Sequence, residues 1–173
     1  MRLLEFINEE MSDPIIYLDM DGVLADFKSG YKKLFGVDPD ISAINDDNIN
    51  KLTGTDFFST LNKLPHADKI VDLAIKYAGS YSICSSPLRG DAKNSAFYKT
   101  EWIKKNLSPQ PKQIIITGKK DSYAKGKNIL IDDRQKVLQP WIDRGGIGIW
   151  YNAYIHDVEK VANELKKIFE RKQ

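Results

Sequence analysis

Two aspartates one residue apart, Asp19 and Asp21, are the clearest candidates for chemistry in this sequence. They follow the apolar run 15–18, which predicts a buried strand of a parallel sheet, and Gly22 beside them allows a sharp turn. Open α/β sheets bind their ligands at the carboxyl ends of their strands. Two carboxylates held close together repel each other unless a cation lies between them. The pair therefore predicts a Mg²⁺ site, because Mg²⁺ prefers oxygen ligands.

Two further apolar runs end in polar pairs. Ser85 and Ser86 follow the second predicted strand, and Asp132 and Asp133 follow the fourth. A buried aspartate without a partner is energetically expensive, so adjacent acids after an apolar run fit metal ligands better than structural residues. The carboxyl ends of parallel strands share one edge of the sheet, so we expect these groups to meet the first acidic pair there.

Apolar runs alternate with helical patterns along most of the chain. This order predicts an α/β fold, a Rossmann-like three-layer sandwich with a central parallel sheet. Strands are expected at 15–18, 81–84, 113–117, 128–131 and 146–151, and helices at 2–10, 27–35, 65–78, 92–107, 134–144 and 155–172. In the helix 92–107 the inward residues are expected to be Phe97, Trp102, Ile103 and Leu107.

The stretch from Asp19 to Phe27, Asp-Met-Asp-Gly-Val-Leu-Ala-Asp-Phe, resembles the first motif of the haloacid dehalogenase (HAD) superfamily of phosphohydrolases. More narrowly, it resembles the 5'(3')-deoxyribonucleotidase family. The resemblance implies that Asp19 attacks phosphorus and becomes a phosphoaspartate, and that Asp21 acts as general acid and then as general base. It extends over about residues 15–151, with the motifs in the family's order.

The second and fourth motifs of the superfamily match the other polar strand ends. Ser85 takes the place of the hydroxyl residue that binds a phosphate oxygen, and Ser86 is expected at the substrate. By resemblance Asp133 is a direct Mg²⁺ ligand, together with Asp19 and the backbone carbonyl of Asp21. Asp132 is expected to act through water or to orient a neighbour.

The third motif is a lysine that offsets the negative charge of the nucleophile and the phosphate. The family spacing, in which two residues separate a threonine from the lysine, selects Lys120 after Thr117. Because the distance in sequence from Lys120 to the fourth motif is longer than expected, Lys119 and Lys125 stay open as alternatives.

Three more residues are expected near the substrate. Lys99 matches a family lysine that reaches the phosphate, and Arg89 is a second candidate for this role. Phe27 occupies a position whose ring contacts the substrate in the deoxyribonucleotidases, although an aromatic core residue is an equally good interpretation.

The segment 37–64 is polar but contains irregularly spaced large apolar residues. Because disordered segments carry fewer such residues, we expect short helices there. In the superfamily this place, after the first strand, holds a small helical cap that closes over the site and excludes water. The predicted division is a HAD-like core of 1–27 and 79–173 and a cap of 28–78.

Composition limits the remaining possibilities. The chain has 173 residues, a formal net charge of +2 and one cysteine. It is therefore expected to be one folded core without an intrachain disulfide, in a reducing compartment. The sequence predicts neither a signal peptide nor a bilayer span, so we expect a cytoplasmic protein, monomeric or homodimeric. Dispersed basic residues favour a small anionic substrate over stable binding to duplex nucleic acid.

Together these features predict a Mg²⁺-dependent phosphomonoesterase. It would hydrolyse (deoxy)nucleoside monophosphates to nucleoside and phosphate through a phosphoaspartate on Asp19. Two alternatives stay open: a HAD phosphatase acting on another phosphate ester, such as a sugar phosphate or a polynucleotide 3'-phosphate, and a non-catalytic phosphate-binding regulatory protein. A receiver-type switch is disfavoured because its third strand ends in an aspartate, whereas here that strand ends in Thr117 and Gly118.

Overall fold

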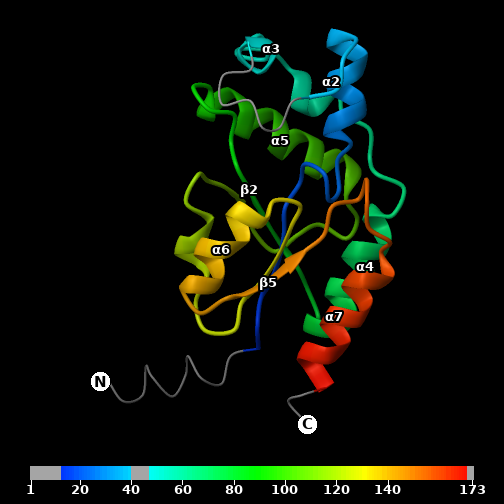
Figure 1. Cartoon of the computed structure of the whole chain (residues 1–173), viewed down its shortest axis with the longest axis vertical. Coiled ribbons are helices and arrows are strands. Elements are labelled where there is room, and N and C mark those ends of the chain that lie inside the picture. The colour runs from blue at the N-terminus through cyan, green and yellow to red at the C-terminus, as the bar shows by residue number, and fades with distance from the viewer. Residues whose placement is uncertain (1–12, 40–46, 171–173) are drawn as a thin grey trace.

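A five-stranded, all-parallel sheet forms the centre of the protein (Figure 1). The computed structural model describes residues 13–39 and 47–170. The strands are β1 (Ile16–Leu18), β2 (Ser82–Ser85), β3 (Ile114–Ile116), β4 (Ile129–Asp132) and β5 (Ile147–Trp150). They lie in the order β3-β2-β1-β4-β5, so the chain leaves β1 toward one edge and later crosses to the other. This confirms the predicted α/β fold with a central parallel sheet.

Strand β1 lies in the middle of the sheet between β2 and β4. Every residue of these three strands is buried, as expected for a parallel sheet covered on both faces. Leu18 is opposite Ile83 on one side and Ile131 on the other. This register aligns the carboxyl ends of the three strands, so the polar residues that follow them lie at the same edge of the sheet.

Helices cover both faces of the sheet. They are α2 (Phe27–Phe35), α3 (Asp47–Asn50), α4 (Ala67–Ala78), α5 (Ala92–Asn106), α6 (Gln135–Asp143) and α7 (Glu159–Glu170), with 3₁₀ turns η1 (Phe57–Ser59) and η2 (Lys120–Tyr123). Side chains of Tyr17, Cys84 and Leu130 pack with α6 on one face. The alternate strand residues pack with α4, α5 and α7 on the other. Figure 1 shows α6 on one side of the sheet and α4 and α7 on the other, so the three-layer prediction is confirmed.

Some predicted details differ from the structure. Phe97 is 59% exposed rather than inward, because the buried face of α5 carries Ser95 and Lys99 beside Trp102. The last helix begins at Glu159 instead of residue 155. The predicted helix 2–10 lies outside the described residues. Among the described residues, no helix has the length and apolarity that a membrane span requires.

The helices between β1 and β2 pack in two different parts of the molecule. Figure 1 shows α2 and α3 at the end of the molecule beyond the sheet, near α5, whereas α4 lies alongside α7. The predicted division into core and cap stays a prediction. The packing of α4 beside the sheet favours a cap that ends before this helix.

Hydrogen bonds attach part of this segment to α5. The indole N–H of Trp102 donates to the carbonyl oxygen of Leu61 at 2.7 Å. At the start of α5, Asp91 accepts a hydrogen bond from the backbone N–H of Gly54 at 2.8 Å, and the Asn94 amide donates to the carbonyl of Thr55. Residues 54–61 are therefore fixed to the helix that carries Lys99.

Replacing Trp102 by phenylalanine should destabilise the protein. The ring is completely buried, and loss of its N–H leaves the Leu61 carbonyl without this donor inside the protein. The expected loss in free energy of unfolding is about 1–3 kcal/mol, measured by urea denaturation. Phe97→Leu, on the exposed side of the same helix, is the control and should change stability by less than about 0.5 kcal/mol. Equal effects of the two substitutions would contradict the proposed role of this hydrogen bond.

Candidate active site

The turn after β1 is built around Gly22. This residue has φ +75°, a conformation that residues with a Cβ rarely adopt. A Cβ added here would lie 2.5 Å from Oδ2 of Asp133. The Gly22 carbonyl accepts a hydrogen bond from the N–H of Ala153, and the Asp19 N–H donates to Ile131. The loops after β1, β4 and β5 therefore pack directly against one another at this edge.

The side chain of Lys120 lies between two carboxylates. Its Nζ is 2.8 Å from Oδ1 of Asp19 and 2.6 Å from Oδ2 of Asp132, and it is only 3% exposed. Lys119 and Lys125, the two alternatives from the sequence, are exposed. The geometry therefore favours Lys120 as the lysine beside the nucleophile. The 3₁₀ turn η2 begins at Lys120 and takes up part of the unexpectedly long spacing that follows it.

Charges around Asp19 keep it ionised. Burial alone would raise the pKa of Asp19, but the positive charges of Lys120, Arg134 and Lys99 outweigh burial and lower it. Burial likewise acts to lower the pKa of Lys120, and the two neighbouring carboxylates raise it instead. Asp19 is therefore a buried anion with its charge preserved, which is the form that a carboxylate nucleophile requires.

Three carboxylates from two adjacent strands form a cluster. Oxygen atoms of Asp19, Asp132 and Asp133 lie within 4.8 Å of one another. Both oxygens of Asp132 are occupied, one by Lys120 and the other by the backbone N–H of Arg134 at 2.9 Å. The carboxylate of Asp133 accepts no hydrogen bond from the described part of the chain. This difference supports Asp133 as a direct metal ligand and Asp132 as a residue that orients its neighbours.

The cluster fits a divalent cation. Burial, followed by the repulsion of Asp19 and Asp132, raises the pKa of Asp133 to about 8. A cation among these oxygens would remove that repulsion, and an all-oxygen donor set suits Mg²⁺. In the predicted arrangement, Asp19 and Asp133 would hold the ion. The side-chain carboxylate of Asp21 pairs with another residue. The ligand that Asp21 was predicted to supply to the metal is its backbone carbonyl oxygen.

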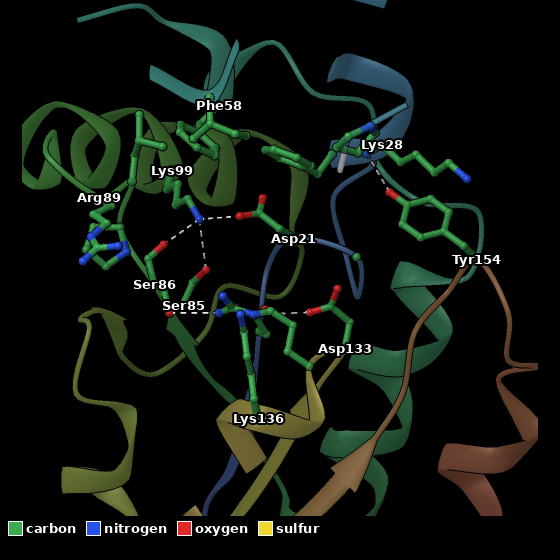
Figure 2. Close-up of a pocket in the computed structure, with 18 residues that line it drawn as sticks. Asp21, Lys28, Phe58, Ser85, Ser86, Arg89, Lys99, Asp133, Lys136 and Tyr154 are labelled. Atoms are coloured by element: carbon green, nitrogen blue, oxygen red, sulfur yellow. Dashed lines mark hydrogen bonds and ion pairs between the residues drawn. The ribbon is translucent and has the colours of Figure 1, made fainter. Parts of the chain in front are cut away.

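Lys99 joins the first and second polar strand ends. This buried side chain forms an ion pair with Asp21 at 2.5 Å and bonds to the hydroxyl of Ser85 and the carbonyl of Ser86 (Figure 2). The other carboxylate oxygen of Asp21, Oδ1, is buried and has no hydrogen-bond partner among the residues described. Arg89, the second candidate for the place of Lys99, is exposed.

Sequence reasoning did not identify Arg134 and Tyr154. Arg134 donates to the hydroxyl of Ser86 at 3.1 Å, and its guanidinium lies 3.8 Å from Asp132. Its position directly after the acidic pair was an available signal. The Tyr154 hydroxyl donates to Asp26 at 2.9 Å and accepts the backbone N–H of Lys28. No local pattern links residues so far apart in sequence.

Most of the site residues described above line one cavity of about 330 Å³, at the lower end of the range for small-molecule sites. One wall is apolar and includes Phe27, Ile49 and Phe58. The ring of Phe27 also packs edge-on against Phe57, with centroids 5.6 Å apart. Phe27 therefore contributes both to the pocket and to the aromatic packing, so neither interpretation of this residue is excluded.

The chain is similar to known proteins in sequence and in fold. No protein-family model matches the chain. The chain is 27% identical over 146 residues to the mitochondrial 5'(3')-deoxyribonucleotidases of mouse and human. These alignments cover 70% of this chain, 65% of the mouse protein and 63% of the human protein. The chain thus spans slightly less than two thirds of the length of these relatives.

A solved structure shares the fold. The crystal structure of a HAD-superfamily hydrolase from Ehrlichia chaffeensis superposes with a TM-score of 0.53 and 16% sequence identity, covering 91% of this chain and 98% of that one. The predicted resemblance is therefore confirmed: the fold is similar to that of a HAD-superfamily hydrolase, and the sequence is similar to those of 5'(3')-deoxyribonucleotidases. The expected cytoplasmic location stays a prediction, and both named relatives are mitochondrial.

Replacing Lys120 by methionine should strongly destabilise the protein at pH 7. The substitution leaves Asp19 and Asp132 as buried carboxylates without the charge between them, which typically costs about 3–5 kcal/mol. The measurement is chemical denaturation of the metal-free protein. Lys119→Met, a neighbouring exposed lysine, is the matched control and should change the free energy of unfolding by less than about 0.5 kcal/mol. A similar result for both variants would show that Lys120 does not balance the buried acids.

The affinity for Mg²⁺ should rise with pH between about 6 and 8. The raised pKa of Asp133 leaves its carboxyl protonated at neutral pH without metal, and a carboxyl must lose its proton to ligate an ion. The dissociation constant should fall by up to about tenfold per pH unit in this range. Calorimetry in buffers of different ionisation enthalpy measures both the affinity and the released proton.

The variant Asp133→Asn should bind Mg²⁺ weakly and without this pH dependence. Asp72→Asn, an exposed aspartate on α4, should behave like the unmodified protein. A dissociation constant that is constant from pH 6 to 8, with no proton released, would contradict the assignment of Asp133.

Proposed function

We propose that this chain is a Mg²⁺-dependent phosphomonoesterase that hydrolyses (deoxy)nucleoside monophosphates through a phosphoaspartate on Asp19. The observation that carries the proposal is the buried Asp19, kept ionised by its neighbouring cations, in a pocket that is also lined by Ser85, Lys99 and Arg134. This is the arrangement that in-line attack on a bound phosphate requires: an anionic nucleophile together with donors for the phosphoryl oxygens.

Asp19 supplies the nucleophilic oxygen. Lys120 occupies Oδ1 of its carboxylate, so Oδ2 is the atom left to attack phosphorus. Fixing one oxygen also orients the other, which reduces the entropy lost in reaching the attacking geometry. The positive charge of Lys120 compensates for the approach of an anionic substrate to an anionic nucleophile.

Asp21 is placed for proton transfer. Its Oδ1 atom is directed at no other protein group described, while Oδ2 pairs with Lys99. In the first step Asp21 would give a proton to the oxygen of the leaving nucleoside. In the second step the same carboxylate would take a proton from the water that hydrolyses the aspartyl phosphate.

Three groups would bind the phosphoryl oxygens. The Ser85 hydroxyl and the Lys99 ammonium lie 3.3 Å apart, and the Arg134 guanidinium reaches the same loop through Ser86. Their positive charge and donors are fixed before the substrate binds, which is the form of stabilisation that lowers barriers most. When bound at Asp19 and Asp133, Mg²⁺ would act as a Lewis acid toward a phosphate oxygen.

The apolar wall supports a nucleoside as the leaving group. Phe27 and Phe58 line the pocket with rings 6.3 Å apart, and aromatic faces of this kind pack favourably against planar groups. The names of the mouse and human relatives point to the same class of substrate.

Replacing Asp19 by asparagine should abolish phosphate release. The amide cannot form the phosphoaspartate, so we expect turnover to fall by at least about 10³-fold, as when other covalent nucleophiles are removed. The assay measures inorganic phosphate with and without Mg²⁺ from 5'- and 3'-ribonucleotides and deoxyribonucleotides, sugar phosphates and an aryl phosphate. Asp72→Asn is the control and should retain full activity.

Different outcomes separate the possible functions. Mg²⁺-dependent release that favours deoxynucleotides supports the proposal as stated. Release from sugar phosphates or the aryl phosphate alone would keep the chemistry but reject the nucleotide. Full activity of Asp19→Asn would reject the mechanism, and no release from any substrate by the unmodified protein would favour a phosphate-binding, non-catalytic role.

A further inference from the structure

Two cations of the pocket have neither a role in the site described above nor an ion pair with a described residue. Five cationic side chains line the cavity: Lys28, Arg89, Lys99, Arg134 and Lys136. Lys99 and Arg134 lie next to carboxylates of the site, and Lys28 lies 3.9 Å from Asp38. Within residues 13–39 and 47–170, Arg89 and Lys136 form no ion pair, and both are exposed.

The inner site is close to electrical balance without these two residues. It contains three cations, Lys99, Lys120 and Arg134, and four carboxylates, which leaves one net negative charge when all are ionised. A divalent cation changes this to one positive charge, and a bound phosphate dianion changes it back to one negative charge. The scissile phosphate therefore does not account for the additional positive charges of Arg89 and Lys136.

Arg89 lies in the loop after β2, and Lys136 lies in the first turn of α6, just beyond the neighbouring loop after β4. Arg89 follows Ser86 by three positions after β2, and Lys136 follows Arg134 by two positions after β4. The hydrogen bond from Arg134 to Ser86 joins these loops at 3.1 Å. Figure 2 shows Arg89 at one side of the pocket beyond Ser86 and the Lys136 side chain extending from α6 toward the pocket, both away from Lys28 and Tyr154.

The pocket thus offers three kinds of surface to one ligand. There is a phosphate site at Asp19, an apolar wall at Phe27 and Phe58, and a cationic rim formed by Arg89 and Lys136. A nucleoside monophosphate would use the first two and leave the rim without a partner. A ligand that uses all three carries an apolar or aromatic group and two separate anionic groups.

We propose that the preferred substrate carries a second phosphate, bound by Arg89 and Lys136 while the first is hydrolysed at Asp19. This inference rests on the proposed function and narrows its substrate class to a nucleoside with two phosphate groups. The second phosphate belongs either to a free nucleoside 3',5'-bisphosphate or to the internucleotide link of a short oligonucleotide with a terminal phosphate.

The test compares kcat/KM for thymidine 5'- and 3'-monophosphates, thymidine 3',5'-bisphosphate and a thymidine dinucleotide with a terminal phosphate. At low salt the unmodified protein should prefer a substrate with two phosphates by about tenfold, since two exposed charge pairs each contribute modestly. Added salt should reduce this preference, because it screens exposed charges. A higher value for the dinucleotide than for the bisphosphate identifies an oligonucleotide end, and the reverse identifies the free nucleotide.

The double variant Arg89→Gln/Lys136→Gln should lose the preference. Its kcat/KM for substrates with two phosphates should fall about tenfold, with a much smaller change for the monophosphates. Lys105→Gln replaces an exposed lysine at the far end of α5 and is the control. This variant should keep the preference for substrates with two phosphates. Equal kcat/KM values for monophosphates and the two-phosphate substrates would overturn the proposal, as would an equal loss for both classes in the double variant.

Binding to Asp19→Asn separates this proposal from the proposed function. If no substrate is hydrolysed by the unmodified protein, the proposed function fails, and calorimetry with Asp19→Asn still tests the rim. Binding of the bisphosphate about tenfold more tightly than the monophosphate, lost when Arg89 and Lys136 are also replaced, supports the second anion site. Equal affinities for the two nucleotides reject it.

Discussion

One buried ammonium group, that of Lys120, allows the ends of two central strands to carry negative charge inside the protein. Asp19 and Asp132 end neighbouring strands whose register places them side by side. Two buried carboxylates at this distance repel each other, and the desolvation of each one is costly. The lysine opposes both effects: together with Arg134 and Lys99 it keeps Asp19 ionised, whereas burial and the charge of Asp19 still raise the pKa of Asp132. The remaining groups of the site are arranged around this pair.

The tight packing of loops follows from the same arrangement. Asp133 reaches the cluster only because Gly22 leaves room for its carboxylate, at a place where a Cβ would be 2.5 Å away. Arg134 then closes the site by bonding to Asp132 through its backbone and to Ser86 through its side chain. Loops after three strands thus share contacts, so a change in one of them alters the positions of groups on the others.

Much of the fold and half of the site were predictable because the signals are local. Apolar runs ending in acids or serines mark the carboxyl ends of parallel strands, and parallel strands end at one edge. The family spacing selected Lys120, but rejecting Lys119 and Lys125 required the structure, because burial distinguishes Lys120 from the other two. The inward face of α5 was mispredicted at Phe97 because it carries Ser95 and Lys99, whose polarity disguises the helical period. Tyr154 bonds to Asp26 across 128 residues, a distance that no sequence pattern covers.

Two segments that line the pocket, residues 54–61 and the start of α2, are hydrogen-bonded to other parts of the protein. Residues 54–61 are hydrogen-bonded to α5, and the Tyr154 hydroxyl fixes the start of α2. Because these segments are already ordered, the protein loses little chain entropy when a ligand binds between them. Selectivity in such a pocket comes from shape and charge that exist in the free protein.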